Sequence, residues 1–288
     1  MKIYILGGGI TGRIVHSLVP NSTVLEAEDE SKAKRLSQSY GTNYLWEPIE
    51  GFNLKEVKVV TRIDDDLPTK ESVQRYKNKI GKGSEEESEW GLQFQPESRG
   101  YFIMSCPPAE ILYGCRVLGI DMDARSIAVL RPDKEGLSGL ETLHYDQLLS
   151  TIPLSTLVSL TRMDTSFPAK TTFKFKPVYV KVAPRPPEAR FQQDDTVYVN
   201  YLSNPLQEPY RYCDRFGERH YESLMPMGFP HKKLSPGKIW KDSTTDVILK
   251  ILAEQEIHCF GRYGRWNPNE LMHETYNYVK MWRGENGE

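Results

Sequence analysis

The stretch MKIYILGGGITGRIVHSLVPNSTVLEAE, residues 1–28, decides the fold. Residues 2–6 form a short apolar run rich in β-forming side chains, and residues 22–28 form a second one. The residues between these runs are typical of a short helix that Pro20 ends. Strand, glycine turn, helix and strand make a βαβ unit, so the sequence predicts that a parallel sheet begins here.

The glycines at positions 7, 9 and 12 match the GxGxxG pattern where the predicted strand meets the helix. This pattern needs glycine for a tight turn, for close approach of a pyrophosphate, and for close packing of helix against strand. The first turn of the helix then offers unpaired N–H groups to a phosphate anion. We therefore predict that Gly7, Gly9, Ile10, Thr11 and Gly12 bind a dinucleotide.

Glu26 ends the second predicted strand, where an acidic residue can accept hydrogen bonds from a ribose diol. Its distance in sequence from Gly12 is shorter than the usual ~20 residues, which indicates a short helix and loop. We add Glu26 to the predicted dinucleotide site. A glycine turn without a ligand is the alternative interpretation of the whole motif.

The composition excludes several classes of protein. Apolar residues make up 39% of the 288 residues, which is enough for a core, and the formal net charge of −2 argues against a protein that coats nucleic acid. None of the four cysteines lies in a CxxC pair, so we expect no metal site and reduced thiols in a cytoplasmic protein. No stretch approaches the roughly 20 apolar residues of a membrane span. The oligomeric state stays open.

Residues further along the chain alternate like strands. Residues 116–131 predict a β-hairpin with residues 123–125 at its turn. Residues 172–225 predict several strands, largely antiparallel. Near residue 260 a short apolar strand precedes the glycine-bearing stretch CFGRYGRWNPNEL, residues 259–271, and a helix is predicted over residues 269–282. A surface loop before a solvated helix is the plain alternative for this last segment.

Three of these segments resemble the flavoprotein superfamily that includes amine oxidases, protoporphyrinogen oxidase and UDP-galactopyranose mutase. They stand in the family's order: RVLGIDMDARSIAVL (116–130), YDQLLSTIPLSTL (145–157) and HCFGRYGRWNPNELMHETYNYV (258–279). The resemblance implies FAD as the cofactor. The sequence departs from the family in two ways. It lacks a second glycine pair after the acidic residue that would bind the ribose, and Arg35 and residues 41–44 are the nearest candidates for that element. The chain is also short.

The resemblance also implies roles for individual residues. Val117 would lie against the adenine, Thr151 and Pro153 near the dinucleotide, and Gly261 and Arg262 at the pyrophosphate. Residues Asn269, Glu270 and Leu271 would begin a helix under the N1–O2 edge of the flavin. A helix N-terminus at that edge would stabilise the negative charge of the reduced flavin.

The fold class that follows is α/β, with a Rossmann-like FAD-binding domain around a central parallel sheet and a smaller, largely antiparallel β substrate domain. We assign residues 1–50, 100–160 and 225–288 to the FAD-binding domain and residues 51–99 and 161–224 to the substrate domain.

The segment PYRYCDRFGERHYES, residues 209–223, resembles a stretch of the mutase-like branch that brings an arginine and aromatic residues above the flavin. We predict Arg211 and Tyr212 as catalytic residues on this basis. Arginine could clamp a phosphate or carboxylate, and tyrosine could stack on a sugar, a base or an amine. The alternative is that tyrosine and arginine decorate a two-sided sheet. Trp46, Trp90 and Tyr101 are further candidates for the pocket wall.

The resulting functional prediction is an FAD-dependent oxidoreductase that oxidises an amine-bearing substrate by hydride transfer to flavin N5. Two alternatives stay open. One is a mutase-like or lyase-like enzyme that uses flavin without net redox change, for example on a sugar nucleotide. The other acts on a macromolecule such as a modified nucleobase in DNA, for which the only motives are the short chain and the Arg/Tyr cluster.

Overall fold

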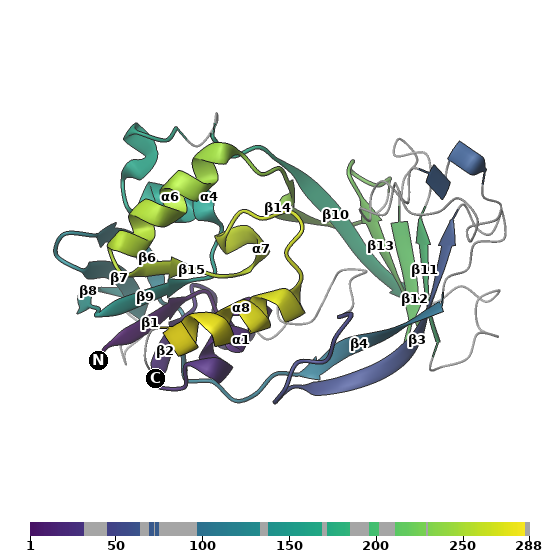
Figure 1. Cartoon of the computed structure of the whole chain (residues 1–288), viewed down its shortest axis with the longest axis horizontal. Helices are drawn as coiled ribbons and strands as arrows, with labels where there is room; N and C mark the ends of the chain where they lie inside the picture. Colours follow the sequence, from purple (N-terminus) through teal and green to yellow (C-terminus); the bar gives the residue numbers. More distant parts are fainter. Residues whose placement is uncertain are drawn as a thin grey trace.

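The computed structural model of the chain describes residues 1–31, 45–63, 69–71, 73–74, 97–132, 138–168, 172–184, 196–201, 211–228 and 230–285. Two halves stand side by side in Figure 1. We name one the parallel-sheet half, which contains both chain ends, and the other the β-rich half. The predicted α/β fold class, a central parallel sheet with a largely antiparallel second sheet, is confirmed.

The parallel-sheet half is built on five parallel strands whose residues alternate between two apolar layers. Ile3 and Ile5 face one layer and Leu6 the other, as expected for a sheet covered on both faces. In order across the sheet the strands are β15 (Ile257–Cys259), β9 (Gln147–Ser150), β1 (Ile3–Leu6), β2 (Ser22–Leu25) and β5 (Ile111–Leu112).

Helices and a small sheet cover the two faces of this parallel sheet. Helices α1 (Ile10–Leu18) and α8 (Met272–Glu285) lie against each other on one face. The other face carries α4 (Leu154–Leu160), α6 (Ser243–Glu254) and an antiparallel three-stranded sheet. The strands of this small sheet are β6 (Arg116–Asp121), β7 (Ser126–Pro132) and β8 (Ser138–His144), so the predicted hairpin over residues 116–131 is confirmed. A short 3₁₀ helix, Met163–Thr165, follows α4.

The β-rich half is one seven-stranded sheet in which only β3 and β11 pair in parallel. Its strands, in order, are β14 (Lys232–Ile239), β10 (Phe175–Pro184), β13 (Glu218–Ser223), β12 (Arg211–Arg215), β11 (Thr196–Tyr201), β3 (Asn53–Ile63) and β4 (Glu97–Ser105). Strand β14 lies within residues 225–288, which the sequence assigned to the FAD-binding domain, yet it pairs with β10. The division of the chain into two domains stays a prediction.

Long strands connect the halves: β10 and β14 run between them along one side in Figure 1, and β3 and β4 along the other. Trp266 packs where the first pair leaves the parallel-sheet half. It is fully buried, its ring meets those of Phe173 and Phe175 edge-on at 5.0 Å and 6.2 Å, and its Nε1 donates to the Trp240 carbonyl at 3.1 Å. One aromatic residue thus fixes the segments that enter β10 and leave β14.

Across the residues that the structure describes, none of the helices has the length and apolar character needed to cross a membrane.

Candidate functional site

The first glycine turn packs so closely that side chains are excluded at two of its positions. Gly7 has φ +97°, and a Cβ added there would lie 2.8 Å from Thr151 Oγ1. A Cβ added at Gly12 would lie 1.9 Å from the Gly7 carbonyl oxygen. At Gly9, in contrast, an added Cβ would meet no described atom within 4 Å. Residues 7–12 therefore form a cradle that packs tightly against the protein at Gly7 and Gly12 and leaves open space for a ligand at Gly9.

Glu26 accepts hydrogen bonds from backbone N–H groups at the edge of this turn. Its Oε2 accepts a hydrogen bond from the Gly8 N–H at 2.7 Å, and its Oε1 accepts one from the Glu28 N–H at 2.9 Å. The carboxylate therefore lies at the carboxyl end of β2 beside the cradle, which is the position that ribose binding would need. The predicted role in ribose binding stays a prediction.

Arg13 is a cation at the cradle that the sequence analysis missed. Its Nε lies 3.3 Å from the Gly8 carbonyl oxygen, and its Nη2 lies 3.3 Å from the Tyr113 hydroxyl. Tyr113 comes directly after β5, so α1 and the edge strand bring the two side chains together. The signal was present in the sequence, because Arg13 directly follows the last glycine of the motif.

The second glycine turn meets the first. It contains the four-residue helix α7 (Gly261–Gly264), whose Gly261 has φ +80°. A Cβ at Gly261 would lie 2.5 Å from Thr11 Cγ2, and a Cβ at Gly264 would lie 3.0 Å from the Ser150 carbonyl oxygen. Residues 7–12, 150–152 and 261–264 therefore converge, as the sequence analysis expected of the two turns and the segment that contains Thr151.

Arg262 carries a positive charge on α7, where its guanidinium lies 6.0 Å from the centre of the Tyr263 ring. The residue is half-buried, and its Nε is buried without a hydrogen-bond partner among the described residues. A buried guanidinium nitrogen without a partner is costly, and an anion would satisfy it. This orphaned nitrogen and the open space at Gly9 fit a pyrophosphate group.

The segment after α7 differs from the prediction. Helix α8 begins at Met272, so the predicted start at residue 269 is wrong by three residues. The Asn269 N–H donates to Asn267 Oδ1 at 3.2 Å, and the Leu271 N–H donates to Glu274 Oε2 at 2.7 Å. Glu274 therefore satisfies a backbone donor at the start of α8, as in a capping box.

Glu270 is buried and bonded within the protein. Its Oε1 accepts from the Thr275 hydroxyl at 2.8 Å, and its Oε2 lies 3.4 Å from Arg265 Nη1. Burial raises the pKa of this carboxyl, although the bonds from Thr275, Arg265 and the Gly261 N–H oppose the rise. Glu270 thus ties α7 to the first turn of α8. Its predicted contact with flavin stays a prediction, as do those of Asn269 and Leu271.

The middle segment supports the first turn. The Thr151 hydroxyl donates to the Leu6 carbonyl at 2.8 Å, which joins the ends of β1 and β9. Pro153 precedes α4 as its N-terminal flanking residue. Val117 lies in β6, half-buried against the core of the parallel-sheet half. Among these three, the structure brings Thr151 directly to the cradle.

Arg211 and Tyr212 are adjacent in β12, so their side chains point to opposite faces of the sheet. Arg211 is buried, with Nη1 3.6 Å from Glu222 Oε2 and its guanidinium 4.7 Å from the Tyr201 ring. Tyr212 is half-buried, and the Arg219 guanidinium stacks 4.1 Å above its ring. The two predicted catalytic side chains therefore do not approach one site from the same face.

Electrostatics link the Arg211 face to the second glycine turn. Burial raises the pKa of the Tyr263 phenol in α7, the nearby Arg262 lowers it, and the carboxylate of Glu222 raises it further. Because Glu222 is the ion-pair partner of Arg211, the Arg211 side of the sheet approaches α7. Tyr212 lies on the other face.

The remaining candidates for the pocket wall are dispersed. Trp46 is exposed, and Tyr101 is half-buried and pairs through its backbone with Leu45. Trp90, Arg35 and residues 41–44 lie outside the described residues. The described part of the chain contains no group of three or more His, Cys, Asp or Glu side chains placed to hold a metal ion.

Comparison with known proteins shows the fold. The chain is similar to reduced UDP-galactopyranose mutase, with a TM-score of 0.60 and 12% identity over 100% of this chain and 96% of that chain. It is also similar to a CLA-producing fatty acid isomerase from P. acnes, with a TM-score of 0.53 and 8% identity over 99% and 98% of the two chains. No protein-family model and no curated protein matches the chain. The likeness to UDP-galactopyranose mutase expected from the sequence is confirmed for the fold.

Proposed function

We propose that the chain is an FAD-dependent enzyme whose cofactor lies where the two glycine turns meet. The observation that carries this proposal is the close contact between Gly261 and the Thr11 side chain, which brings the two glycine turns together. Such a junction leaves N–H groups and one unpaired guanidinium nitrogen, that of Arg262, for an anionic ligand. The fold shared with reduced UDP-galactopyranose mutase supports FAD as that ligand.

The chain's own residues divide the work of holding the cofactor. Residues 7–12 would receive the pyrophosphate at the N-terminus of α1, with Arg262 offsetting its charge. Glu26 would exchange its bond to Gly8 for the ribose. Glu270 would hold the Gly261 turn in place through Thr275 and Arg265. Bound FAD would supply the ability to accept a hydride at N5, and the protein would supply orientation and charge.

Two reactions remain candidates for this site. The resemblance of the sequence segments to amine oxidases supports oxidation of an amine-bearing substrate by hydride transfer to flavin N5. A reaction without net redox change has a separate support, because the two structural neighbours described above are named a mutase and an isomerase. Substrate reduction of the flavin distinguishes the two reactions.

A modified nucleobase in DNA stays a further proposed substrate, and its only support is the short chain and the Arg/Tyr cluster. Binding to DNA that weakens as salt rises would support it, and no binding at low salt would exclude it. A cytoplasmic location is likewise proposed, supported by four free cysteines and testable by cell fractionation.

The test of cofactor binding is a visible spectrum of the purified protein, followed by identification of the nucleotide released on denaturation. We expect a yellow protein that releases FAD. A colourless protein that fails to retain added FAD after gel filtration would contradict the proposal.

The test of the reaction uses the FAD-loaded protein. An amine that bleaches the flavin without oxygen would establish oxidation. Activity that appears only after reduction with dithionite would establish the reaction without net redox change.

A further inference from the structure

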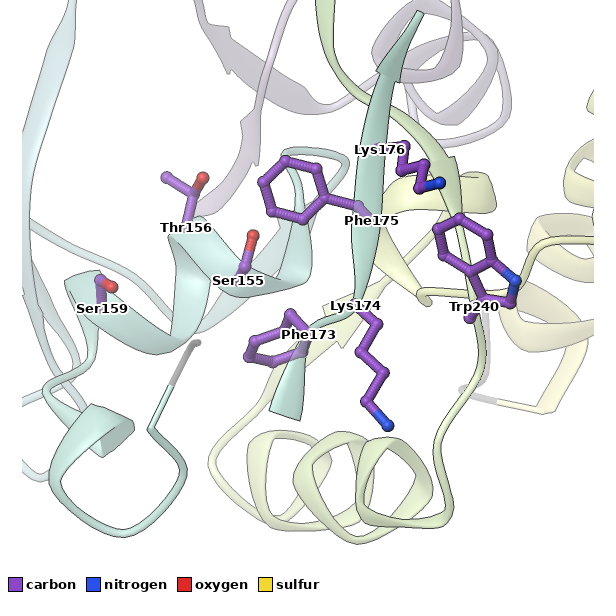
Figure 2. A pocket seen from close by; sticks show the side chains of 8 residues that line it. All are labelled: Ser155, Thr156, Ser159, Phe173, Lys174, Phe175, Lys176 and Trp240. Carbon is purple, nitrogen blue, oxygen red and sulfur yellow. The ribbon is translucent and has the colours of Figure 1, made fainter. Parts of the chain in front are cut away.

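A second candidate site lies away from the glycine turns, beside α4. It is a pocket with a volume of about 880 Å³, within the range of cavities that bind small molecules. Figure 2 shows it between α4 and the start of β10, with the residue after β14 on its far side. Its lining residues are Ser155, Thr156, Ser159, Phe173, Lys174, Phe175, Lys176 and Trp240.

Aromatic rings supply most of the apolar wall. Phe175 is 44% exposed and Trp240 is 39% exposed, although large aromatic side chains normally gain free energy from burial. Phe173 is buried behind them against Trp266. The two rings lie on opposite sides of the strand in Figure 2, and Trp240, on the side away from α4, offers a surface on which a planar molecule could stack.

Positive charge lines the opposite side of the pocket. In Figure 2, Lys174 and Lys176 project from the strand away from α4, beside Trp240. Lys238 adds a third ammonium group, 5.5 Å from the centre of the Trp240 ring. The nearby carboxylate of Asp242 is bonded to the Thr244 N–H, and Lys174 helps to lower its pKa. In the described part of the chain, neither Lys174 nor Lys176 forms an ion pair within 4 Å.

Trp266 separates this pocket from the glycine turns. Its ring contacts both phenylalanines of the pocket wall, and its chain neighbour Arg265 hydrogen-bonds to the Gly261 carbonyl through its backbone N–H. A ligand in the pocket would therefore lie behind Trp266 and would not compete with a dinucleotide for Gly9 or Arg262. Binding at the pocket can be measured on protein whose cofactor site is filled.

We propose that this pocket binds a small aromatic carboxylate. The exposed ring of Trp240 would contact the planar ring, and Lys174 and Lys176, which lie on the same side of the strand as Trp240, would pair with the carboxylate. The proposal does not depend on the reaction of the flavin.

The experiment is calorimetric titration of the purified full chain, saturated with FAD, with three probes. The first is 1-naphthoate, which has a ring and a charge. The second is 1-naphthalenemethanol, which has the ring alone, and the third is cyclohexanecarboxylate, which has the charge alone. We expect 1-naphthoate to bind about tenfold more tightly than either comparator, a difference of ~1.4 kcal/mol.

Variants locate the site. Trp240→Ala and the double variant Lys174→Glu/Lys176→Glu should each weaken 1-naphthoate binding about tenfold or more. Their controls are Trp46→Ala, at a tryptophan elsewhere that is 54% exposed, and Lys250→Glu on the outer surface of α6, both of which should leave binding unchanged. All of these side chains are exposed, and circular dichroism checks that each variant folds.

Three results would overturn the proposal: no binding of 1-naphthoate up to its solubility limit, equal affinity for all three probes, or an equal loss of affinity in the variants and their controls. Because FAD content is measured separately by absorbance, failure of this pocket is distinguishable from failure of the proposed cofactor site.

Discussion

The two halves of the molecule fix their backbones in different ways. The parallel sheet of the first half uses strands of two to four residues, and its turns are closed by glycines that touch neighbouring backbone, Thr151 or Thr11. The β-rich half uses strands of five to eleven residues that carry side-chain stacks. One such stack places Arg219 over Tyr212 and pairs it with the buried Asp214 at 2.5 Å and 2.7 Å. A methyl group added at a closely packed glycine of the first half should therefore damage the fold. In the β-rich half the same holds at Gly237, where an added Cβ would lie 2.5 Å from the Val178 nitrogen, and not at Gly217.

The largest expected effect comes from Gly12→Ala. The new Cβ would lie 1.9 Å from the Gly7 carbonyl oxygen, and this clash with backbone leaves little room for relaxation. We expect a loss of roughly 3 kcal/mol of stability, together with loss of FAD. Urea unfolding and flavin absorbance measure the two effects.

Gly9→Ala is the control that separates folding from cofactor binding. No described atom lies within 4 Å of an added Cβ, so the fold should be retained while FAD content falls. A Gly9→Ala protein with full FAD content would show that the open space at Gly9 is not the phosphate site.

A smaller effect distinguishes two glycines with the same backbone conformation. Gly261 and Gly217 both have φ +80°, but an added Cβ meets Thr11 Cγ2 at 2.5 Å in the first and no described atom within 4 Å in the second. Each alanine variant should lose about 1 kcal/mol to backbone strain, and Gly261→Ala should lose more because of the contact. Thermal unfolding of both variants measures the difference.

A double variant tests whether the contact with Thr11 causes the extra loss of stability in Gly261→Ala. Thr11→Ala removes the clashing methyl group, so it should recover part of the loss in Gly261→Ala and none of the loss in Gly217→Ala. Equal destabilisation by Gly261→Ala and Gly217→Ala would mean that the contact with Thr11 has no energetic consequence.

The smallest effect is a pH dependence expected from the parallel-sheet half. Burial lowers the pKa of His16 below 6.5, and the neutral ring is held because Nδ1 bonds to Ser22 Oγ while Nε2 accepts from the Glu110 N–H. The unfolded chain therefore binds this proton more readily. The contribution of the neutral, buried His16 ring to the free energy of unfolding is fully present above pH 6.5 and is lost as the pH falls through the folded-state pKa of this ring.

Denaturant unfolding at several values between about pH 8 and about pH 5 measures this loss. His16→Gln should flatten the profile, because glutamine keeps hydrogen-bonding groups and does not titrate in this range. His258, whose pKa burial also lowers, should contribute to the remaining slope. A slope that His16→Gln leaves unchanged would assign the pH dependence to other groups.

The sequence predicted the elements in which local pattern and final structure agree. The βαβ unit ending at Leu25, the β6–β7 hairpin and the β12–β13 pair were all expected, because each joins neighbours along the chain. Strand β3 was missed. Its buried residues Val57 and Val59 alternate with charged ones, but its partner β11 is more than a hundred residues away and no local turn indicates the pairing.

Prediction of the candidate site was limited in the same way, because features set by contacts distant in sequence could not be predicted. The glycine turns could be predicted because glycine records a backbone requirement in the sequence itself. The start of α8 could not, because Asn267, Asn269 and Glu274 are all plausible capping residues and only the packed structure selects Glu274. The partnership of Arg13 with Tyr113 likewise depends on where β5 joins the sheet.

The contact between Thr11 and Gly261 has a consequence for biosynthesis. The two residues are separated by 250 positions, so the junction is a highly non-local contact that forms late and slowly compared with local structure. A nascent chain on the ribosome has no completed nucleotide cradle until residues beyond Gly264 have emerged. Capture of the prosthetic group should therefore follow the emergence of Gly264 from the ribosome, after the N-terminal βαβ unit has formed without its partner.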